Sequence, residues 1–434
     1  MAKSKVHGEK KQYIDKSQRT DKKQHASKSQ RASKHLSANK NYQANIRTKG
    51  QKGLMCPVAK KCGGCQYQGT EYRRQLQKKE EQVRKLLEPY TTTERIVGMD
   101  NPFHYRNKIH AAFEYTKAGE VISGVYQEGT HHVVPVDECL IEDEKADAII
   151  RDIRKLAKSF KIKIYNEDTG YGLLRHVLIR VGKKSGQIMV VLVTVSPVFP
   201  SKNNFVKALR KLHPEITTVV LNVNDRDTSM VLGERDIVLF GKGYIEDILC
   251  GKKFRISPQS FYQINAVQTE KLYGKAMELA EFTGKERIID AYCGIGTIGL
   301  IASSYVKQVM AVELNKNAVR DAIYNAKNNG IKNVRFYAAD AGMFMRNLAA
   351  EGEKVDVVMM DPPRAGSDKA FLESIVKLRP EKVVYISCNP VTLARDLGYL
   401  CSHGYQADTA VPFDLFPFTE HVETVCLLSR KAPV

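Results

Sequence analysis

The spacing of hydrophobic and polar positions changes along this chain. Over residues 72–87, Leu and Val recur among Gln, Lys and Glu at the spacing of an amphipathic helix, which Pro89 ends. Residues 96–140 alternate in polarity and contain turn residues, as strands do. A second helical pattern covers residues 144–160. The first third of the chain therefore predicts two helices that flank a group of strands.

Three further strands are predicted at residues 177–181, 187–195 and 217–223, with a basic helix at residues 202–212 between the last two. The strands are short and rich in Val, Leu and Ile. Together with the preceding elements they predict a smaller α+β domain that has no catalytic motif of its own.

The last third has a different order of elements, in which apolar runs typical of buried strands alternate with helical patterns. Each strand is followed by a helix, and this β-α-β order predicts a doubly wound parallel sheet whose ligands bind beyond the carboxyl ends of the strands. The predicted elements are a helix ending at Phe282, strands 287–290 and 308–312, helices 298–304 and 318–329, and buried runs 355–360 and 383–386.

A chain of 434 residues exceeds what one hydrophobic core usually supports, so we expect several domains in an α/β protein. The predicted division is a disordered basic tail at 1–52, a cysteine segment with a helix at 53–95, a central α+β RNA-binding domain at 96–252, which contains Cys139, and a Rossmann-like catalytic domain at 253–434.

Charge is concentrated at the amino-terminal end. The net charge is +20, and residues 1–52 hold 15 Lys and Arg against three acidic residues. This segment has almost no large apolar residues, so burial cannot offset the entropy of ordering it. Clustered lysines release counterions when they meet phosphates, which predicts RNA or DNA as the partner. The alternative is a tail that only keeps the protein in solution.

The chain has no apolar stretch of membrane-spanning length and no signal-peptide pattern at its start, so we expect a cytoplasmic protein that does not bind membranes. In a reducing compartment its nine cysteines are expected to be metal ligands, nucleophiles or buried small residues. Nothing in the sequence indicates an obligate dimer, and a monomer is expected.

Three cysteines lie close together in the sequence, near the start of the part of the chain that is predicted to be ordered. Cys56, Cys62 and Cys65 form C-x5-C-x2-C, in which two glycines allow a tight turn. A tetrahedral zinc site or a cubane iron–sulfur cluster needs a fourth ligand, and Cys139 is the candidate. The spacing alone does not decide between a zinc site and an iron–sulfur cluster.

Polar and reactive residues follow two of the buried runs. Ser387-Cys388-Asn389-Pro390 comes after 383–386, Asp361-Pro362-Pro363-Arg364 comes after 355–360, and Glu423 lies near the carboxyl end. A cysteine, an aspartate and a glutamate at the ends of buried strands indicate covalent chemistry on a ligand bound there.

A glycine-rich turn precedes these motifs. Gly294, Gly296 and Gly299 match G-x-G-x-x-G, and Glu313 follows Gly294 by 19 residues, where an acid could accept both ribose hydroxyls. The fingerprint fits NAD as well as S-adenosylmethionine. A dehydrogenase would leave Asp361 and Cys388 without a role, so methyl transfer is favoured.

Methyl transfer to uracil accounts for each motif. The C5 carbon of uracil is a weak nucleophile, and a thiolate added at C6 would activate it; Cys388 is the candidate. The C5 proton must then leave to a base, for which Glu423 is the candidate. Amino-group methyltransferases carry an aromatic residue after the paired prolines, where this chain has Arg364. No cysteine follows the prolines, as it often does in RNA cytosine-C5 enzymes, so uracil is preferred.

The chain resembles the RNA (uracil-C5) methyltransferase family from about Met55 to Arg430. The resemblance is carried by C-x5-C-G-G-C, F-Y-Q-I-N, D-A-Y-C-G-I-G-T, D-P-P-R-A-G, S-C-N-P-V-T-L-A-R-D and H-V-E. The resemblance implies that a 4Fe–4S cluster is bound by four cysteines: Cys56, Cys62, Cys65 and Cys139. It implies contacts to S-adenosylmethionine or the target base from Gln263, Tyr292, Glu313 and Asp361, with Thr297 and Asp340 as further contact positions. It also implies that Cys388 is the nucleophile and Glu423 the proton acceptor.

One departure from the family affects the predicted RNA. Many relatives begin with a small β-barrel that binds RNA, whereas here a lysine-rich tail leads directly to Cys56. Members with the cysteine motif mostly resemble enzymes of large-subunit ribosomal RNA, so 23S ribosomal RNA is predicted over transfer RNA. The remaining alternatives are a transfer RNA enzyme, an RNA-binding assembly factor without turnover, and a redox or iron sensor.

Overall fold

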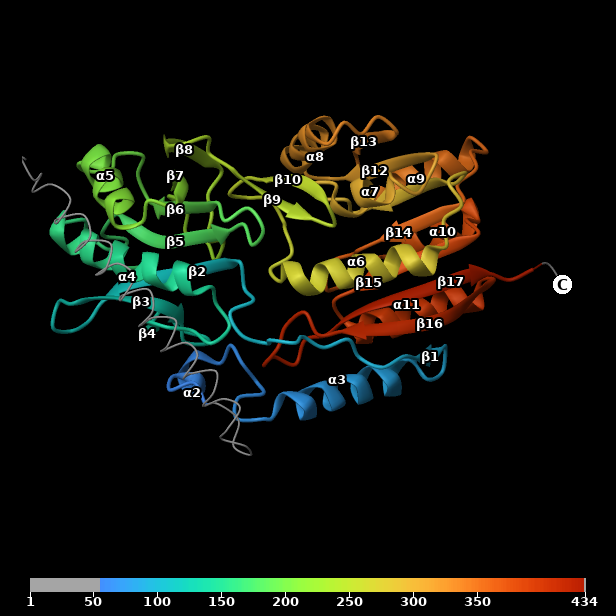
Figure 1. Ribbon diagram of the computed structural model, residues 1–434, viewed down its shortest axis with the longest axis horizontal. Helices are drawn as coiled ribbons and strands as arrows, with labels where there is room; N and C mark the ends of the chain where they lie inside the picture. The colour runs from blue at the N-terminus through green and yellow to red at the C-terminus, as the bar shows by residue number, and fades with distance from the viewer. Residues whose placement is uncertain (1–54, 433–434) are drawn as a thin grey trace, which may run out of the picture. The chain divides into compact units, whose positions relative to one another are not determined.

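The structure is a computed structural model that describes residues 55–432. The basic tail predicted at residues 1–52 lies outside the described residues. The described part of the chain contains two large β-sheets, a two-stranded sheet between them in sequence, and helices packed on both large sheets (Figure 1). No helix in this part is both long and apolar enough to cross a bilayer.

The carboxyl-terminal sheet has eight strands in the order β1-β16-β17-β15-β14-β11-β12-β13. The five strands from β11 to β15 pair in parallel, as the sequence predicts for a doubly wound fold. The strands are β11 (Arg287–Ala291), β12 (Gln308–Glu313), β13 (Val334–Ala338), β14 (Val357–Met360), β15 (Lys382–Ser387), β16 (Tyr405–Phe413) and β17 (Glu423–Arg430).

One strand departs from the parallel arrangement that the sequence predicts for this sheet. β16 and β17 form an antiparallel hairpin, and β17 inserts between β16 and β15, running antiparallel to both. β17 can run antiparallel because β16 leads into it through a hairpin connection, whereas two parallel strands need a crossover. The hairpin brings the carboxyl-terminal segment back beside the end of β15.

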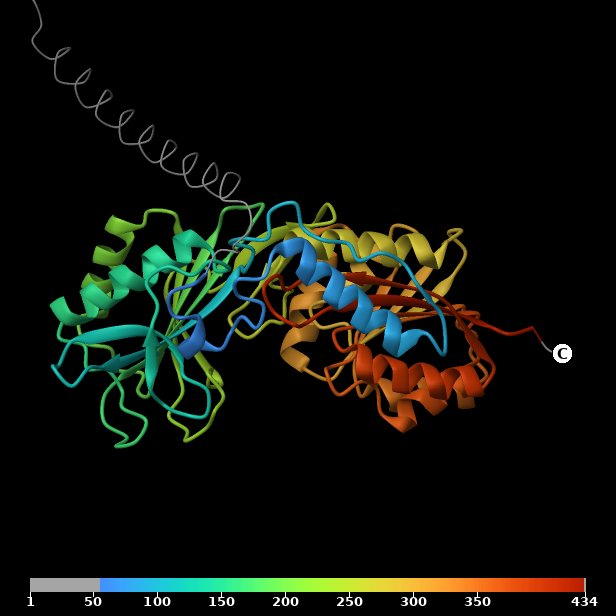
Figure 2. The same cartoon turned by 90° about the horizontal axis from the view of Figure 1, so that it is seen from below.

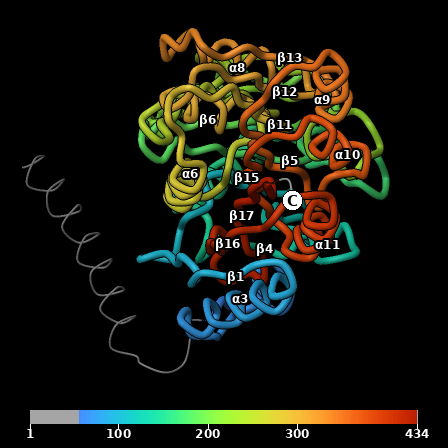
Figure 3. The backbone as a smooth tube through the Cα atoms, turned by 90° about the vertical axis from the view of Figure 1, so that its right-hand side faces the viewer, coloured from blue at the N-terminus to red at the C-terminus, as the bar shows by residue number. Residues whose placement is uncertain are grey.

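Helices cover both faces of this sheet. They are α6 (Ala266–Ala280), α7 (Thr297–Ala302), α8 (Lys316–Asn328), α9 (Ala341–Ala350), α10 (Lys369–Leu378) and α11 (Pro390–Ser402). The helix predicted at residues 72–87 is α3 (Tyr72–Leu87), which packs on α11 and β16 and leads into the short parallel edge strand β1 (Thr92–Thr93) (Figure 3). The amino-terminal segment therefore joins the carboxyl-terminal sheet.

The central sheet has seven strands in the order β4-β3-β2-β5-β6-β7-β8. Helices α4 (Glu144–Ser159) and α5 (Lys202–Leu212) lie on one side of it (Figure 2), where Ile149 and Phe205 join a core with Val177 and Ile179. The strands are β2 (Lys108–Tyr115), β3 (Val121–Tyr126), β4 (Val133–Pro135), β5 (Leu174–Val181), β6 (Ile188–Thr194), β7 (Ile216–Val223) and β8 (Arg235–Phe240).

The two sheets are joined through an antiparallel hairpin of β9 (Ile245–Leu249) and β10 (Lys252–Ile256). Polar contacts then fix the segment that enters the catalytic domain. Asn107 donates from Nδ2 to the carbonyl oxygen of Gln263 at 3.0 Å, and Arg180 donates to the carbonyl of Pro258 at 3.0 Å. Because these partners are buried, losing either contact would leave a polar group unpaired.

Candidate active site

The register of the carboxyl-terminal hairpin places the predicted nucleophile opposite the predicted base. In the antiparallel pair of β15 and β17, Ser387 lies opposite Thr424, so the next position along puts Cys388 opposite Glu423. Cys388 is half-buried, and Glu423 is 2% exposed. Two residues separated by 35 positions in the chain thus meet because β17 returns antiparallel to β15.

Asp361 joins this pair from the neighbouring strand. It follows the last residue of β14, which pairs in parallel with β15. The loop after Asp361 is tied to α11: Asn389 and Thr392 both donate to the carbonyl oxygen of Arg364, at 3.1 and 3.4 Å. Gly366 has a φ of +75°, and a Cβ there would lie 2.5 Å from the Arg395 side chain. The loop is therefore held in one conformation beside Cys388.

The carboxyl groups here are held in an unusual electrostatic state. Burial and then the charge of Asp361 raise the pKa of Glu423 to about 8, against the opposing charge of Arg364. Burial also raises the pKa of Asp361 to about 7. The pKa of the Cys388 thiol is raised to about 12 by burial and by the charges of Glu423 and Asp361, again opposed by Arg364. An acid whose pKa lies near neutrality is suited to proton transfer.

Tyr273, on α6, connects Asp361 and Glu423 to two other predicted residues. Its fully buried phenol lies beside the side chains of Thr297 and Gln263. Burial, and then the charges of Asp361 and Glu423, raise the pKa of this phenol. Five side chains from distant parts of the sequence therefore lie together near the carboxyl ends of β11, β14 and β15: Gln263, Tyr273, Thr297, Asp361 and Glu423.

The glycine turn after β11 is built around two acids. The backbone N–H of Gly299 donates to Asp290 Oδ2 at 2.7 Å, and that of Gly294 donates to Glu313 Oε2 at 3.0 Å. A Cβ at Gly299 would lie 2.7 Å from the same Asp290 oxygen, so only glycine fits there. Burial, together with the charges of Asp361 and Glu313, raises the pKa of Asp290 to about 8, and the hydrogen bond from Gly299 opposes the rise.

These acids fit a cationic ligand such as S-adenosylmethionine. Besides burial, the charges of Asp361 and Glu313 raise the pKa of Asp290, and the charge of Asp361 raises that of Glu423, so these four acids lie near one another. Within the described chain, Asp290 Oδ1 and Glu423 Oε2 are buried without a hydrogen-bond partner. A sulfonium and an ammonium group would offset this concentration of negative charge.

Tyr292 and Asp340 lie on the other flank of the glycine turn. Tyr292 has a φ of +65°, and its ring packs on Phe371 with centroids 5.1 Å apart. Asp340 is exposed and caps α9 by accepting from the backbone N–H of Met343 at 2.8 Å. The charge of Asp340 contributes to raising the pKa of Tyr292 to about 12, after burial and Asp368. The two side chains are therefore neighbours.

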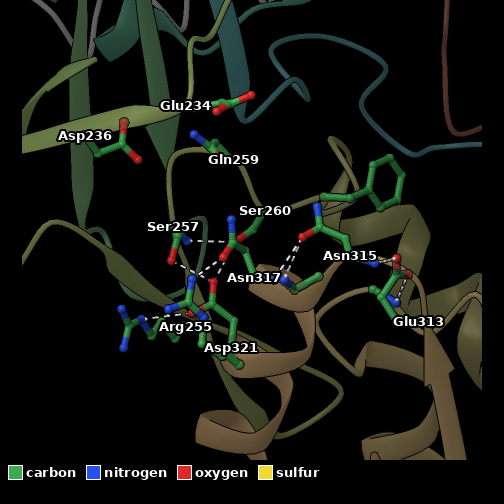
Figure 4. A pocket seen from close by; sticks show the side chains of 14 residues that line it. Glu234, Asp236, Arg255, Ser257, Gln259, Ser260, Glu313, Asn315, Asn317 and Asp321 are labelled. Atoms are coloured by element: carbon green, nitrogen blue, oxygen red, sulfur yellow. Dashed lines mark hydrogen bonds and ion pairs between the residues drawn. The ribbon is translucent and has the colours of Figure 1, made fainter. Parts of the chain in front are cut away.

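A cavity of about 550 Å³ opens beside Glu313 and Gly294 (Figure 4). On its opposite wall, Asp321 Oδ2 accepts from the hydroxyls of Ser257 and Ser260, at 2.6 and 2.8 Å. These bonds fix the segment that carries Phe261, whose ring is 64% exposed although it is a large apolar group. An exposed aromatic ring at the mouth of a cavity is suited to stacking on a planar ligand.

Four residues of this site were not predicted as site residues: Asp290, Arg364, Tyr273 and Phe261. Arg364 and Phe261 each lie inside a motif that the sequence does single out, so their closeness to predicted residues was an available signal. Tyr273 lies in an ordinary helical pattern, and only the packing of α6 shows that it faces Gln263 and Thr297.

The four predicted cluster cysteines lie in one region without forming a ligand set. Cys65 and Cys139 both pack beside Tyr105 and Phe418. Burial raises the pKa of the Cys65 thiol, and the charges of Cys62 and Cys56 also raise it, so these two cysteines are nearby. Among residues 55–432, however, no three His, Cys, Asp or Glu side chains come close enough to hold a metal ion. This arrangement does not show the cluster that the resemblance implies, and no step of the chemistry is assigned to one.

Comparisons with known proteins agree with this geometry. A family model described as tRNA (Uracil-5-)-methyltransferase matches residues 71–431. An uncharacterized RNA methyltransferase of Halalkalibacterium halodurans is 43% identical over 381 residues, which are 87% of this chain and 83% of that protein. One of Staphylococcus aureus is 39% identical over 392 residues, 89% of this chain and 86% of that protein.

A solved structure is also similar over most of the chain. It is that of Pyrococcus abyssi tRNA (uracil-54, C5)-methyltransferase in complex with S-adenosyl-L-homocysteine. Its TM-score to this chain is 0.72 at 29% sequence identity, with 84% of this chain and 85% of that chain covered.

Proposed function

The chain belongs to the tRNA (uracil-5-)-methyltransferase family, and on that premise we propose that it methylates the C5 carbon of uracil in RNA, with S-adenosylmethionine as the methyl donor. The family and the relatives make the protein an RNA methyltransferase. The observation that carries the proposal for this chain's own residues is the opposition of Cys388 and Glu423 across β15 and β17, with Asp361 beside them.

Cys388 is the proposed nucleophile. After its thiol loses a proton to solvent, the Cys388 thiolate would add to C6 of uracil, and the electrons of the C5=C6 double bond would move toward C5 and the C4 oxygen, giving an enolate with a nucleophilic C5. Burial and the two acids hold the free thiol protonated, and the nearby Arg364 is the group that favours the thiolate. S-adenosylmethionine, when bound, supplies the methyl group that C5 accepts.

Glu423 is the proposed base for the last step. After methylation C5 still carries its hydrogen, and removing this proton lets the C5=C6 bond form again while the Cys388 sulfur leaves as a thiolate. A carboxylate with a pKa of about 8 can hold this proton near neutral pH. Glu423 Oε2 has no hydrogen-bond partner in the described chain, which leaves it available for the proton.

The residues proposed to hold the cofactor are Gln263, Tyr292, Thr297, Glu313, Asp340 and Asp361. Glu313 and Asp361 contribute negative charge, and the Gly294 turn brings the backbone close to Glu313. Phe261, which is exposed next to this region, is proposed to stack on the uracil once it leaves its RNA fold. Such extrusion costs least in a single-stranded loop.

For the RNA itself we propose 23S ribosomal RNA, on the resemblance of the cysteine motif. The description of the matching family model and the name of the Pyrococcus abyssi protein both refer to transfer RNA, which makes transfer RNA the alternative. Mapping 5-methyluridine in both RNA classes from cells with and without this protein separates the two.

Several parts of the proposal rest on the sequence alone. They are the 4Fe–4S cluster on the four cysteines, the division into a tail, a cysteine segment, a central RNA-binding domain and a catalytic domain, a monomeric state and a cytoplasmic location. The cluster is tested by iron and sulfide content and by the visible absorbance of protein purified without oxygen. Binding of about four iron atoms per chain is the expected result.

The activity is tested with Cys388→Ala and a matched control, Cys401→Ala. Cys401 is a half-buried cysteine on α11 that does not belong to the site. With RNA transcripts that lack modifications, we expect the wild type and Cys401→Ala to form 5-methyluridine. Cys388→Ala should form none while its affinity for S-adenosylmethionine is unchanged. Turnover by Cys388→Ala would reject covalent catalysis.

A further inference from the structure

The central sheet carries a second cavity, of about 820 Å³, that the methylation site does not use. It lies on β2, β3 and β5, where even-numbered residues face away from the core made with α4 and α5. Toward β6 the same face contributes Leu178, Met189 and Val191 to the core shared with the catalytic domain. The cavity is therefore the uncovered remainder of a sheet face that is otherwise buried.

The small side chain of Ala112 leaves room for the hollow. Across three neighbouring strands the register places Gly124 opposite Ala112, and Ala112 opposite His176. At Gly124 a Cβ would lie 2.0 Å from the carbonyl oxygen of Val134, so the backbone of β4 closes that side, and the sheet surface is low at Ala112. The connections that rise around it are the turn at Gln127–Thr130, the loop that carries Glu167 and the loop that carries Thr228 and Ser229.

Aromatic rings form one wall. The rings of Tyr126 and His176 meet edge to face with centroids 5.8 Å apart, and Tyr126 lies 6.1 Å from the ring of His131. His110 also lines the cavity, and its Nε2 has no hydrogen-bond partner among the described residues. The wall offers flat surfaces together with an imidazole nitrogen that can still form a hydrogen bond.

The charges in the cavity do not favour an anion. Arg175 is already paired: it donates to both carboxylate oxygens of Glu167, at 3.0 and 2.7 Å, and to the carbonyl of Asn224 at 3.0 Å. Burial, aided by neighbouring cations, lowers the pKa of His110 to about 3 and that of His176 to about 4, so both rings are neutral near pH 7. Glu128 and Asp227 at the rim add negative charge.

From this combination we propose that the cavity is a second nucleobase site, which receives an unpaired base of the RNA substrate by stacking on Tyr126 and by hydrogen bonding to His110. A base is planar and uncharged, so it suits aromatic walls with neutral imidazoles, whereas a phosphate would meet a paired arginine and acids. The inference rests on the proposed function, because it takes RNA as the ligand. It adds a contact on the central sheet, away from the reacting uracil.

The test compares Tyr126→Ala with Tyr171→Ala in the full chain. Tyr171 is 65% exposed on the same domain but does not line the cavity, so it controls for the loss of an exposed tyrosine. The probe is a fluorescein-labelled random pool of single-stranded RNA about 12 nucleotides long, which covers a typical binding site. Fluorescence anisotropy gives Kd at several salt concentrations.

We expect Tyr126→Ala to raise Kd at least about fivefold, the lower end for loss of one base–aromatic stack. The slope of log Kd against log salt should equal that of the wild type, since no phosphate contact is lost. Tyr171→Ala should bind like the wild type. Equal Kd values for Tyr126→Ala and the wild type, an equal loss in both variants, or a reduced salt slope would each overturn the proposal.

A second variant keeps the test decisive if Tyr126→Ala does not fold. Ser229→Trp places a bulky side chain at the exposed mouth without touching the sheet, and it should raise Kd by a similar factor. Formation of 5-methyluridine is measured in parallel. If the proposed function fails, the wild type forms no product; if only this inference fails, product forms and both variants bind RNA normally.

Discussion

The buried acid Glu423 leads to a prediction in which activity and stability change in opposite directions. Glu423 is 2% exposed, and burial together with the charge of Asp361 raises its pKa to about 8. Glu423→Gln keeps the shape of the side chain and removes its charge. We expect this variant to lose turnover, and to unfold at a higher temperature than the wild type near neutral pH.

The sign of the expected stability change follows from the direction in which folding shifts the pKa of Glu423. An acid whose pKa is raised on folding destabilises the native state above its unfolded pKa of about 4.5, and this cost grows with pH until the folded pKa of about 8. For one such group the cost is roughly 1 kcal/mol at pH 5 and about 3 kcal/mol at pH 7. Glutamine has no such cost, so the variant should gain about 2 kcal/mol between these pH values.

Thermal unfolding at pH 5 and pH 7 measures this difference. For a folded unit of this size, about 2 kcal/mol corresponds to a Tm difference of roughly 2–3 °C. The matched control is Glu420→Gln, because Glu420 is exposed and lies three residues away. Its Tm should follow the wild type at both pH values. If the Tm difference between Glu423→Gln and the wild type does not increase from pH 5 to pH 7, the account of a buried, destabilised carboxyl is wrong.

Three other predictions concern pH, the cofactor and the fold. The kcat/KM for methylation should rise as pH increases from about 6 to 9, because Cys388 and Glu423 both act deprotonated and both have raised pKa values; a falling profile would contradict this. Glu313→Gln should weaken S-adenosylmethionine binding about tenfold by calorimetry while RNA binding is kept, since a charged acceptor is lost; unchanged cofactor affinity would exclude that role. Lys79 and Asp414 form a fully buried ion pair at 2.7 Å, so Lys79→Met should lower stability by about 3–5 kcal/mol in denaturant unfolding. Lys79→Met with Asp414→Leu should recover much of that loss, and no recovery would argue against an unpaired charge as its cause.

The sequence predicts local structure well where one side of an element is buried. The helices at residues 72–87 and 202–212 have the observed bounds of α3 and α5, because their apolar positions repeat at the helical period. The strands at β11, β12 and β15 are likewise found within one residue of the prediction. The β16–β17 hairpin was missed because most of β17 and the second half of β16 are buried on both faces, and because the connection between the two strands has no two-residue turn motif.

The candidate site was partly predictable for a related reason. Motifs at strand ends indicate Asp361 and Cys388, since the carboxyl ends of parallel strands share one edge. Nothing in the sequence shows that Glu423 lies opposite Cys388, which depends on the register of β17. Tyr273 was not predicted because the role of a residue on a helix depends on what the helix packs against.

The central claim is that the Cys388 sulfur attacks uracil and that Glu423 then removes the C5 proton. The most direct measurement is mass spectrometry of Glu423→Gln after reaction with substrate RNA and S-adenosylmethionine, followed by nuclease and protease digestion. The account predicts a peptide in which Cys388 carries a methylated uridine nucleotide, because elimination cannot occur without the base. Unmodified Cys388 together with free RNA containing 5-methyluridine would contradict it.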